Sequence, residues 1–233
     1  MPARASRRAK LVLAVAAACS TLLAIGLVAC ALPPLSPQAT PVPGQGEVVS
    51  EDRTTTAFRH ISVGAGIKVV VGTGGDTSVT LSAQQNLIKL ITTEVQDDQL
   101  VVQVTAPGVT STLPITLTIS VPELDSITLS AGATGIIEDV GGPLAVDVSA
   151  GSAMKAIGQV ESLKVTASSG AVATLGDLLA GSAVVNLTGG SSVAMHVTGG
   201  VTGTADGGST LVLTEKPASV DVKTSGGATV QGG

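Results

Sequence analysis

Aromatic side chains are almost absent from this sequence: Phe58 is its single phenylalanine, and it has no tryptophan and no tyrosine. Proteins that hold sugars by stacking them on aromatic rings need such platforms, so the composition disfavours that mode of binding. The same lack suits a thin core, because small aliphatic side chains fill a narrow space that rings cannot enter.

Cysteine and histidine are also scarce, with two residues of each type. Cys19 and Cys30 both lie in the N-terminal segment, so the folded part has no disulfide. A zinc site needs three or four ligands, and His60 and His196 have no cysteine to join them. We therefore expect no metal site and no cofactor, and a fold stabilised by main-chain hydrogen bonds and side-chain packing.

Positive charge is low, since 12 lysines and arginines stand against 17 acidic residues. Four of the basic residues precede the apolar N-terminal segment, and a chain without them carries a net charge of about −9. Such a surface disfavours nucleic acid and anionic lipid headgroups as partners.

The N-terminal segment has the layout of a secretory signal: basic residues before position 11, then an apolar run over 11–29. The run ends Leu27-Val28-Ala29-Cys30, which resembles a bacterial lipobox. By that resemblance Cys30 is lipidated and anchors an exported protein, facing outward, to the membrane of the cell envelope. An uncleaved transmembrane helix is the alternative, because 19 apolar residues nearly span a bilayer. Cys19 is a competing site, but alanine occupies its −3 position.

Residues 31–46 contain five prolines and no charge, which is typical of an extended tether. The sequence thus divides into a signal peptide (1–29), a lipidated cysteine with its tether (30–54) and a folded domain (55–233).

Glycine, by contrast, is abundant, and it marks a repeat. The motif Ser168-Ser169-Gly170-Ala171 returns at nearly fixed intervals, with central glycines at Gly132, Gly151, Gly170, Gly190, Gly208 and Gly227. The separations are 19, 19, 20, 18 and 19 residues. A period near 19 with β-type residues between the marks matches one coil of a β-solenoid.

Equivalent positions of the repeat form columns with period-two alternation. The positions five and three before each glycine are mostly small and aliphatic, and the position between them is polar. Apolar positions recur three and five after the glycine, so each coil holds at least two short strands. The glycines mark corners, where we expect a bulky side chain to run into the next coil.

The columns recur in the same order, which favours parallel stacking over hairpins. The sequence predicts an all-β protein: a single-stranded parallel β-helix over 122–233, preceded by an irregular β region over 58–121. In that region we expect a hairpin turn at 96–99, a helical turn within 86–90 and an alternating strand over 114–121. In the same region Gly64-Ala65-Gly66 is surrounded by apolar residues: Phe58, Ile61, Val63, Ile67, Val69 and Val71.

The order of these pieces resembles the head-GIN domain family, whose members are described as auto-transporter adhesins. The resemblance rests on Phe58–Val71, Asp76–Leu81, the hairpin up to Leu100, Thr118–Leu124 and the serine-glycine coils, and it covers 55–233. It implies a right-handed parallel β-helix at the surface of exported bacterial proteins. It implies no reaction and no catalytic residue.

The candidate binding face is the polar column beside the corners. Its members are Thr128, Asp147, Thr166, Asn186 and Thr204, with Ser149, Ser168 and Thr188 at the corners. An envelope polymer or a protein could lie along such rows, whereas the plainer interpretation is a solvated surface. The unpaired edge of the final coil is a rival site.

An enzyme of the β-helix class needs two carboxylates within reach of one bond. Asp139, Asp177 and Glu215 share a position in the repeat but fall on alternate coils, about 10 Å apart, which is loose even for an inverting pair. We therefore favour a non-enzymatic adhesion or interaction module of the envelope. The alternatives are a carbohydrate-active enzyme and an accessory protein of envelope-stress signalling.

Overall fold

The structure, a computed structural model, describes residues 41–232. The signal segment with Cys19 and Cys30 lies outside the described residues. No helix among residues 41–232 is long and apolar enough to cross a membrane. The N-terminal elements are β1 (Val42–Pro43), β2 (Val48–Asp52), β3 (His60–Val63), β4 (Lys68–Thr73), β5 (Ser78–Gln84), a 3-10 turn (Ile88–Leu90), β6 (Ile91–Gln96), β7 (Gln99–Val104), β8 (Val109–Thr110) and β9 (Thr116–Val121).

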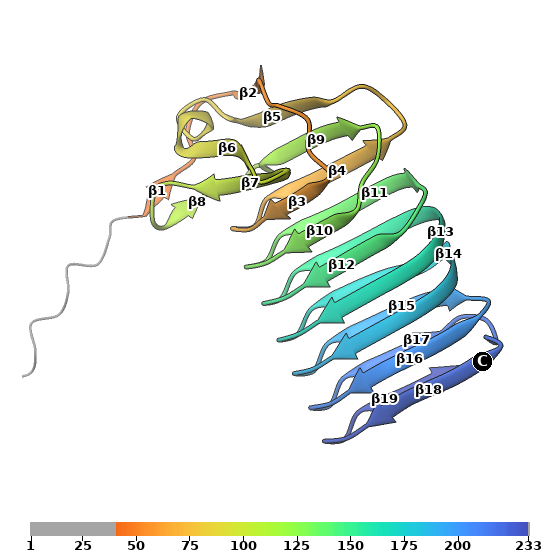
Figure 1. The fold of residues 1–233 in the computed structure, drawn as a ribbon. Coiled ribbons are helices and arrows are strands. Elements are labelled where there is room, and N and C mark those ends of the chain that lie inside the picture. Colours follow the sequence, from red (N-terminus) through yellow and green to blue (C-terminus); the bar gives the residue numbers. More distant parts are fainter. Residues whose placement is uncertain (1–40, 233) are drawn as a thin grey trace, which may run out of the picture. The chain divides into compact units, whose positions relative to one another are not determined.

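The repeat region forms the predicted parallel solenoid (Figure 1). Its strands are β10 (Ser126–Leu129), β11 (Thr134–Val140), β12 (Leu144–Val148), β13 (Ala153–Ala167), β14 (Val172–Leu187), β15 (Ser192–Val197), β16 (Gly200–Ala205), β17 (Thr210–Leu213), β18 (Ser219–Thr224) and β19 (Thr229–Gly232). Columns read from the sequence are rows of register partners: Ile127, Val146, Val165, Val185, Gly203 and Val222, for example, face one another in turn. The column five residues after the glycine is interrupted by a register shift between β13 and β14.

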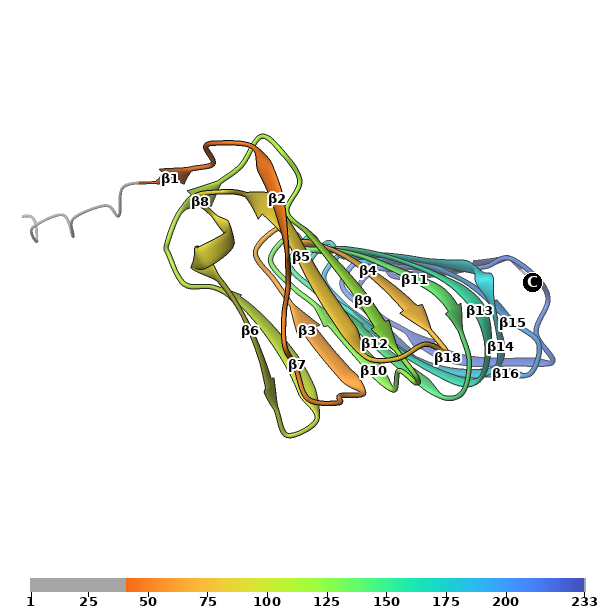
Figure 2. The same ribbon diagram turned by 90° about the horizontal axis from the view of Figure 1, so that it is seen from above.

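Each coil has two arms joined by a glycine corner, and the core lies between the arms (Figure 2). The first arm runs through β10, β12, the second halves of β13 and β14, β16 and β18. The second arm runs through β11, the first halves of β13 and β14, β15, β17 and β19. Alternate residues of both arms are buried as far as β17, so the period-two pattern placed the core of these coils correctly.

Strands from the N-terminal region extend both arms. β3 pairs in parallel with β10, and β4 pairs with β11, so residues 60–73 form a further coil with its corner at Gly64-Ala65-Gly66. β7 and β9 then pair in parallel with β3 and β4 and extend both arms by one more coil. The chain therefore leaves the stack after β4 and returns through residues 99–121 before it enters the regular repeat.

Antiparallel strands close this end of the stack, and we call β5 and β6, which pair directly with the stacked strands β9 and β7, the cap. β6 pairs antiparallel with β7 through the expected hairpin, whose turn residues Asp97 and Asp98 have positive φ. β5 pairs antiparallel with β9, and β2 pairs antiparallel with β5. The expected helical turn is the 3-10 turn at Ile88–Leu90.

The tether ends earlier than the sequence indicated. Residues 42–52, assigned above to the tether, form β1 on β8 and β2 on β5. Asn86 secures this segment, because its side-chain amide donates to the carbonyl of Pro43 and its oxygen accepts from the amide of Gln45. Main-chain and amide bonds of this kind leave no hydrophobic pattern, which explains why composition alone missed them.

The corners are tight turns with two successive residues at positive φ, as in type I′ turns. In the Ser130–Ala133 corner the amide of Ala133 donates to the carbonyl of Ser130 over 3.2 Å. Up to Gly208, the amide of each corner glycine then donates to the next coil: that of Gly132 reaches the carbonyl of Ala150 over 3.1 Å, and that of Gly151 reaches the carbonyl of Ser169 over 3.1 Å. The corners thus form a hydrogen-bonded stack of their own.

The prediction that the corner glycines are crowded by the next coil is wrong. Gly170 has a φ of +74°, and a Cβ atom built on it meets nothing within 4 Å. Gly132, Gly151 and Gly190 are equally open. The corner turns its second central residue away from the stack, so glycine is needed there for its backbone conformation alone. Close approach occurs elsewhere: a Cβ on Gly203 or Gly158 would overlap a carbonyl oxygen of the neighbouring coil.

A column of small residues follows the corners, buried at Ala133, Ser152, Ala171, Ser191 and Ser209 and half-buried at Ala228 on the last coil. Ser191 Oγ donates to the carbonyl of Ala167 over 3.0 Å, whereas the buried Oγ of Ser152 has no partner.

We expect Ser191→Ala to lower the free energy of unfolding by about 1 kcal/mol, because it removes a satisfied buried hydrogen bond. The matched change Ser152→Ala removes an unsatisfied hydroxyl and should leave stability unchanged or raise it. Denaturant unfolding of both variants measures the difference. Equal losses for the two variants would contradict the hydrogen-bond assignment.

Candidate interaction faces

The first arm presents an in-register row of polar side chains. Thr128, Asp147, Thr166, Asn186 and Thr204 are successive register partners, and Lys223 ends the row. Their neighbours on either side are mostly buried, so these side chains point outward, and all are exposed or half-exposed. Successive rungs lie about 4.8 Å apart, and Thr204 Oγ1 donates to Asn186 Oδ1 over 3.2 Å. We call this row the ladder.

A second outward row lies beside the ladder on the same arm. Its members are Ser126, Ala145, Lys164, Val184, Thr202 and Asp221. Between the two rows, Thr128, Asp147, Lys164 and Thr166 line a shallow groove of about 210 Å³. Lys164 was not among the predicted site residues. Its place was readable from the sequence, because it stands two residues before Thr166.

The corner residues predicted for this face lie at its edge. Ser149 and Ser168 are half-buried, and Thr188 is exposed. The main-chain amides of these residues continue the hydrogen bonding between the strands of the first arm. That of Ser168, for example, donates to the carbonyl of Val148 over 3.0 Å. The structure thus places all eight predicted residues along one side of the solenoid.

The opposite face carries a contrasting surface on the same coils. Its outward row is Thr134, Ala153, Val172, Ser192, Thr210 and Thr229, and Val172 is 44% exposed. Thr174 and Ala194 are register partners there, as Thr166 and Asn186 are on the ladder. The two pairs lie on the same two coils and differ only in the face that they occupy.

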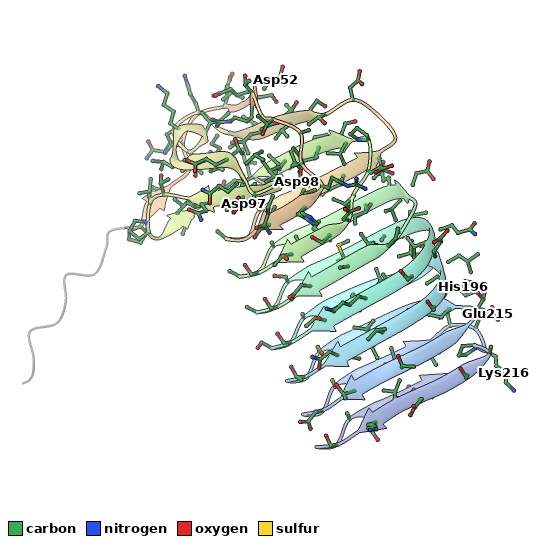
Figure 3. All side chains as sticks on the ribbon, viewed as in Figure 1. Asp52, Asp97, Asp98, His196, Glu215 and Lys216 are labelled. Carbon is green, nitrogen blue, oxygen red and sulfur yellow. The ribbon has the colours of Figure 1, made fainter. Side chains whose placement is uncertain are left out.

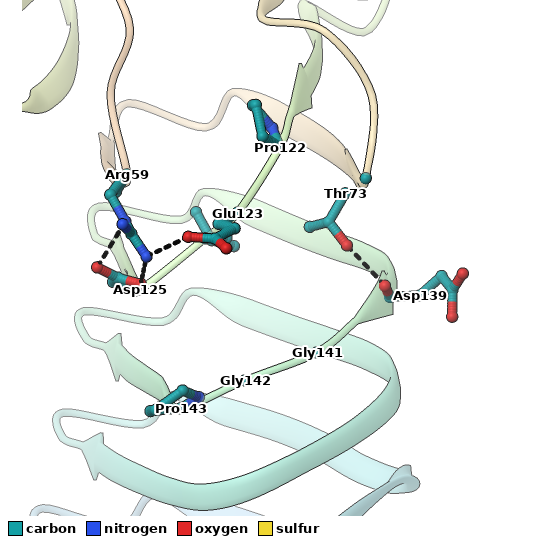
Figure 4. Close-up of a pocket in the computed structure, with 11 residues that line it drawn as sticks. Arg59, Thr73, Pro122, Glu123, Asp125, Asp139, Gly141, Gly142 and Pro143 are labelled. Atoms are coloured by element: carbon teal, nitrogen blue, oxygen red, sulfur yellow. Dashed lines mark hydrogen bonds and ion pairs between the residues drawn. The ribbon is translucent and has the colours of Figure 1, made fainter.

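A cavity of about 420 Å³ opens beside the first coils, and an ion-pair cluster lies at its wall (Figure 4). Arg59 donates through Nε to Asp125 Oδ2 over 2.9 Å and through Nη2 to Asp125 Oδ1 over 3.1 Å. Glu123 also pairs with Nη2 of Arg59. On the far wall Thr73 Oγ1 donates to the main-chain carbonyl of Asp139 over 2.6 Å.

This cluster joins two coils, and both charged groups of its strongest pair are engaged with each other. Hydrogen bonding and Coulomb attraction from Asp125, with a further contribution from Glu123, raise the pKa of Arg59 above its ordinary value. The amide of Asp125 also donates to the carbonyl of Arg59 over 2.9 Å. Arg59 and Asp125 each directly precede the first residue of equivalent strands, β3 and β10, and aligning these strands would have revealed the pair.

The three carboxylates at equivalent repeat positions do not form a pair. Asp177 binds Lys155 over 3.0 Å on the exposed surface. Asp139 lies at the cavity of Arg59, and Glu215 lies in the loop before β18 beside Lys216, near the other end of the stack (Figure 3).

Over residues 41–232, no group of three or more histidine, cysteine or acidic side chains is arranged to hold a metal ion. His60 Nδ1 is 2.8 Å from Ser126 Oγ, a bond between neighbouring coils. Asp97 and Asp98 occupy the hairpin turn, and the carbonyl of Asp98 accepts the amide of Arg59 over 3.1 Å. His196 lies on β15, far along the stack from that hairpin (Figure 3).

Solved structures share this fold at low sequence identity. "A putative adhesin" from Bacteroides fragilis NCTC 9343 superposes with a TM-score of 0.63 at 15% identity, covering 81% of this chain and 98% of its own. "A putative adhesin" from Parabacteroides merdae ATCC 43184 gives 0.50 at 16% identity, covering 82% and 98%. A "putative lipid binding protein" from Parabacteroides distasonis ATCC 8503 gives 0.52 at 10% identity, covering 82% and 98%.

No curated protein matches the sequence. The family model that matches spans residues 57–217, from just before β3 into the loop that precedes β18. That span includes the cap, the Arg59 cluster and most of the ladder. The chain therefore belongs to the head-GIN domain family, described as "putative auto-transporter adhesin".

Proposed function

We propose that this protein is a surface-tethered lipoprotein that binds an envelope polymer or protein through the ladder and catalyses no reaction. The observation that carries the proposal is the register: Thr128, Asp147, Thr166, Asn186 and Thr204 form one straight outward row. Membership of a family of described adhesins supports a role in adhesion.

A row of this kind suits a repetitive partner. Hydroxyl, amide and carboxylate groups recur about every 4.8 Å on a hydrogen-bonded scaffold, so successive units of a polymer can meet equivalent groups. Each contact is weak, but contacts made along one rigid row act together and raise the effective affinity. The low conformational freedom of the sheet also keeps the ordering cost of binding small.

The N-terminal segment supports the location. A lipidated Cys30 would anchor the chain to the membrane of the cell envelope, and the proline-rich residues that follow would hold the solenoid away from the bilayer. The acidic surface would keep the coils from settling on anionic headgroups. The ladder would then face material outside the membrane.

The test compares double variants on the two faces. Thr166→Lys with Asn186→Lys places two like charges on adjacent rungs of the ladder. We expect the affinity for intact cells or isolated envelope to fall about tenfold or more. Thr174→Lys with Ala194→Lys is the matched control on the opposite face of the same coils, and it should bind as the wild type does.

Both variants change exposed or half-exposed positions, so their melting temperatures should stay close to that of the wild type. A glycan array and a pull-down on intact cells with the wild-type chain identify the bound material. Binding that survives the ladder variant and falls in the control would place the interaction on the other face.

A further inference from the structure

The two ends of the solenoid are finished differently among residues 41–232. At one end antiparallel β5 and β6 cover β9 and β7. At the other end β18 pairs only with β16, and β19 pairs only with β17. The last coil therefore presents two strand edges side by side, one on each face (Figure 1).

The direction of the peptide groups on β18 follows from its main-chain hydrogen bonds to β16. The amide of Ser225 donates back to the carbonyl of Ala205 over 2.9 Å. Because alternate residues of a strand direct their amide and carbonyl groups to opposite sides, Val220, Val222 and Thr224 direct theirs to the free edge. The edge is thus a regular set of donors and acceptors.

Apolar surface accompanies this edge. Val220 is 48% exposed, and Val222 and Val230 are only partly buried, whereas Val201 and Leu211 at equivalent positions one coil earlier are fully buried. A strand pair added to this end would complete the burial of Val222 and Val230. Such burial is the main favourable contribution to association of sheets at their ends.

The charges on the edge are self-complementary. Asp221 and Lys223 flank Val222, and both are exposed on the outward side of β18. In an antiparallel pair of two identical strands centred on one residue, the residue before the centre faces the residue after it. Centring on Val222 therefore places Asp221 of each copy opposite Lys223 of the other.

We propose that a second copy of this chain pairs with the last coil, edge to edge, about a twofold axis that passes between the Val222 residues of the two copies. Val222 then faces Val222 of the second copy as a hydrogen-bonded pair, in agreement with the free peptide groups at that residue. Asp221 and Lys223 form the closer, non-hydrogen-bonded pairs, where opposite charges stabilise and like charges destabilise. The symmetry is that of an isologous dimer.

The same axis has a consequence for the ladder. A twofold axis perpendicular to the sheets keeps outward residues outward, so the ladder faces of the two copies join into one surface of about twice the length. The dimer does not depend on the proposed function, because it forms without any ligand. The two proposals can therefore fail separately.

The test follows the dimerisation of the purified full chain in detergent solution by sedimentation at micromolar concentrations. We expect a reversible dimer for the wild type. Asp221→Lys and Lys223→Asp each convert two attractive pairs into two repulsive ones, which should raise the Kd of the dimer about tenfold or more. The double variant Asp221→Lys with Lys223→Asp restores both pairs and should restore the dimer.

Thr202→Lys is the matched control, since Thr202 is the register partner of Asp221 one coil inside the edge. It should leave the Kd unchanged. A wild-type chain that stays monomeric overturns the proposal. A Kd that the single charge reversals leave unchanged, or that the double variant does not restore, overturns it too.

Discussion

Gly203→Val should be among the most destabilising single substitutions in the chain, with a loss of about 4 kcal/mol or more in the free energy of unfolding. Gly203 has φ of +136°, a conformation that valine adopts only under strain. Its Cβ would also overlap the carbonyl oxygen of Val185 and lie 2.9 Å from the amide nitrogen of that residue. Both contacts are with backbone, so the neighbouring coil cannot adjust by a rotamer change.

This expectation opposes the one that the sequence suggests. Gly203 interrupts a column in which Val146, Val165, Val185 and Val222 occupy the equivalent positions. The consensus of the repeat therefore predicts that valine at this position would raise the stability of the fold. The matched change is Gly170→Val, where a Cβ meets open space and the cost is backbone strain alone, about 1 to 2 kcal/mol.

Urea unfolding of both variants measures the two losses. Similar losses at the two glycines would show that the close approach at Gly203 does not exist.

Cys30→Ser should abolish lipid attachment completely, because serine has no thiol to form the thioether on which anchoring by a lipobox depends. The variant should accumulate as an unprocessed precursor or leave the membrane fraction. Metabolic labelling with a fatty-acid analogue, followed by gel analysis of the membrane and soluble fractions, reports both effects.

Cys19→Ser is the control, and it should keep the label and the membrane location of the wild type. Label that persists in Cys30→Ser would reject the assignment of the anchor, and loss of label in Cys19→Ser would move the anchor to that residue.

The regular coils were predictable because the same residue types return at equivalent positions. The alternation around Thr128 and Thr166 fixes which side chains point inward, and the spacing of Gly132, Gly151 and Gly170 fixes the register. The columns agree with the observed pairing even where one coil is a residue longer or shorter.

The cap and the additional coils were less accessible. β3 pairs with β10 across 66 residues of sequence, and no periodic pattern connects strands so far apart. A weak signal existed, since Gly64-Ala65-Gly66 resembles Ser130-Ala131-Gly132 and forms the same kind of corner. The crowding expected at Gly170 was wrong because a sequence shows that a residue is small without showing whether φ or space requires it.

The candidate face was predictable from the columns, but not all of the charged groups near it were. Lys164 stands in the second outward row, which lies outside the predicted face. The Arg59 cluster depends on a pairing between distant strands, so neither Arg59 nor Asp125 shows its partner in the sequence. Residues placed by the repeat were predictable, whereas residues placed by pairing between the N-terminal region and the coils were not.

The most direct measurement asks whether material bound by the ladder is released unchanged. The wild-type chain is incubated for hours with excess envelope material that it retains, and the mass distribution of that material is followed. We expect saturable binding that the Thr166→Lys and Asn186→Lys pair removes, with no change in mass. Shorter fragments that accumulate with time in proportion to the protein would contradict a binding module and identify an enzyme.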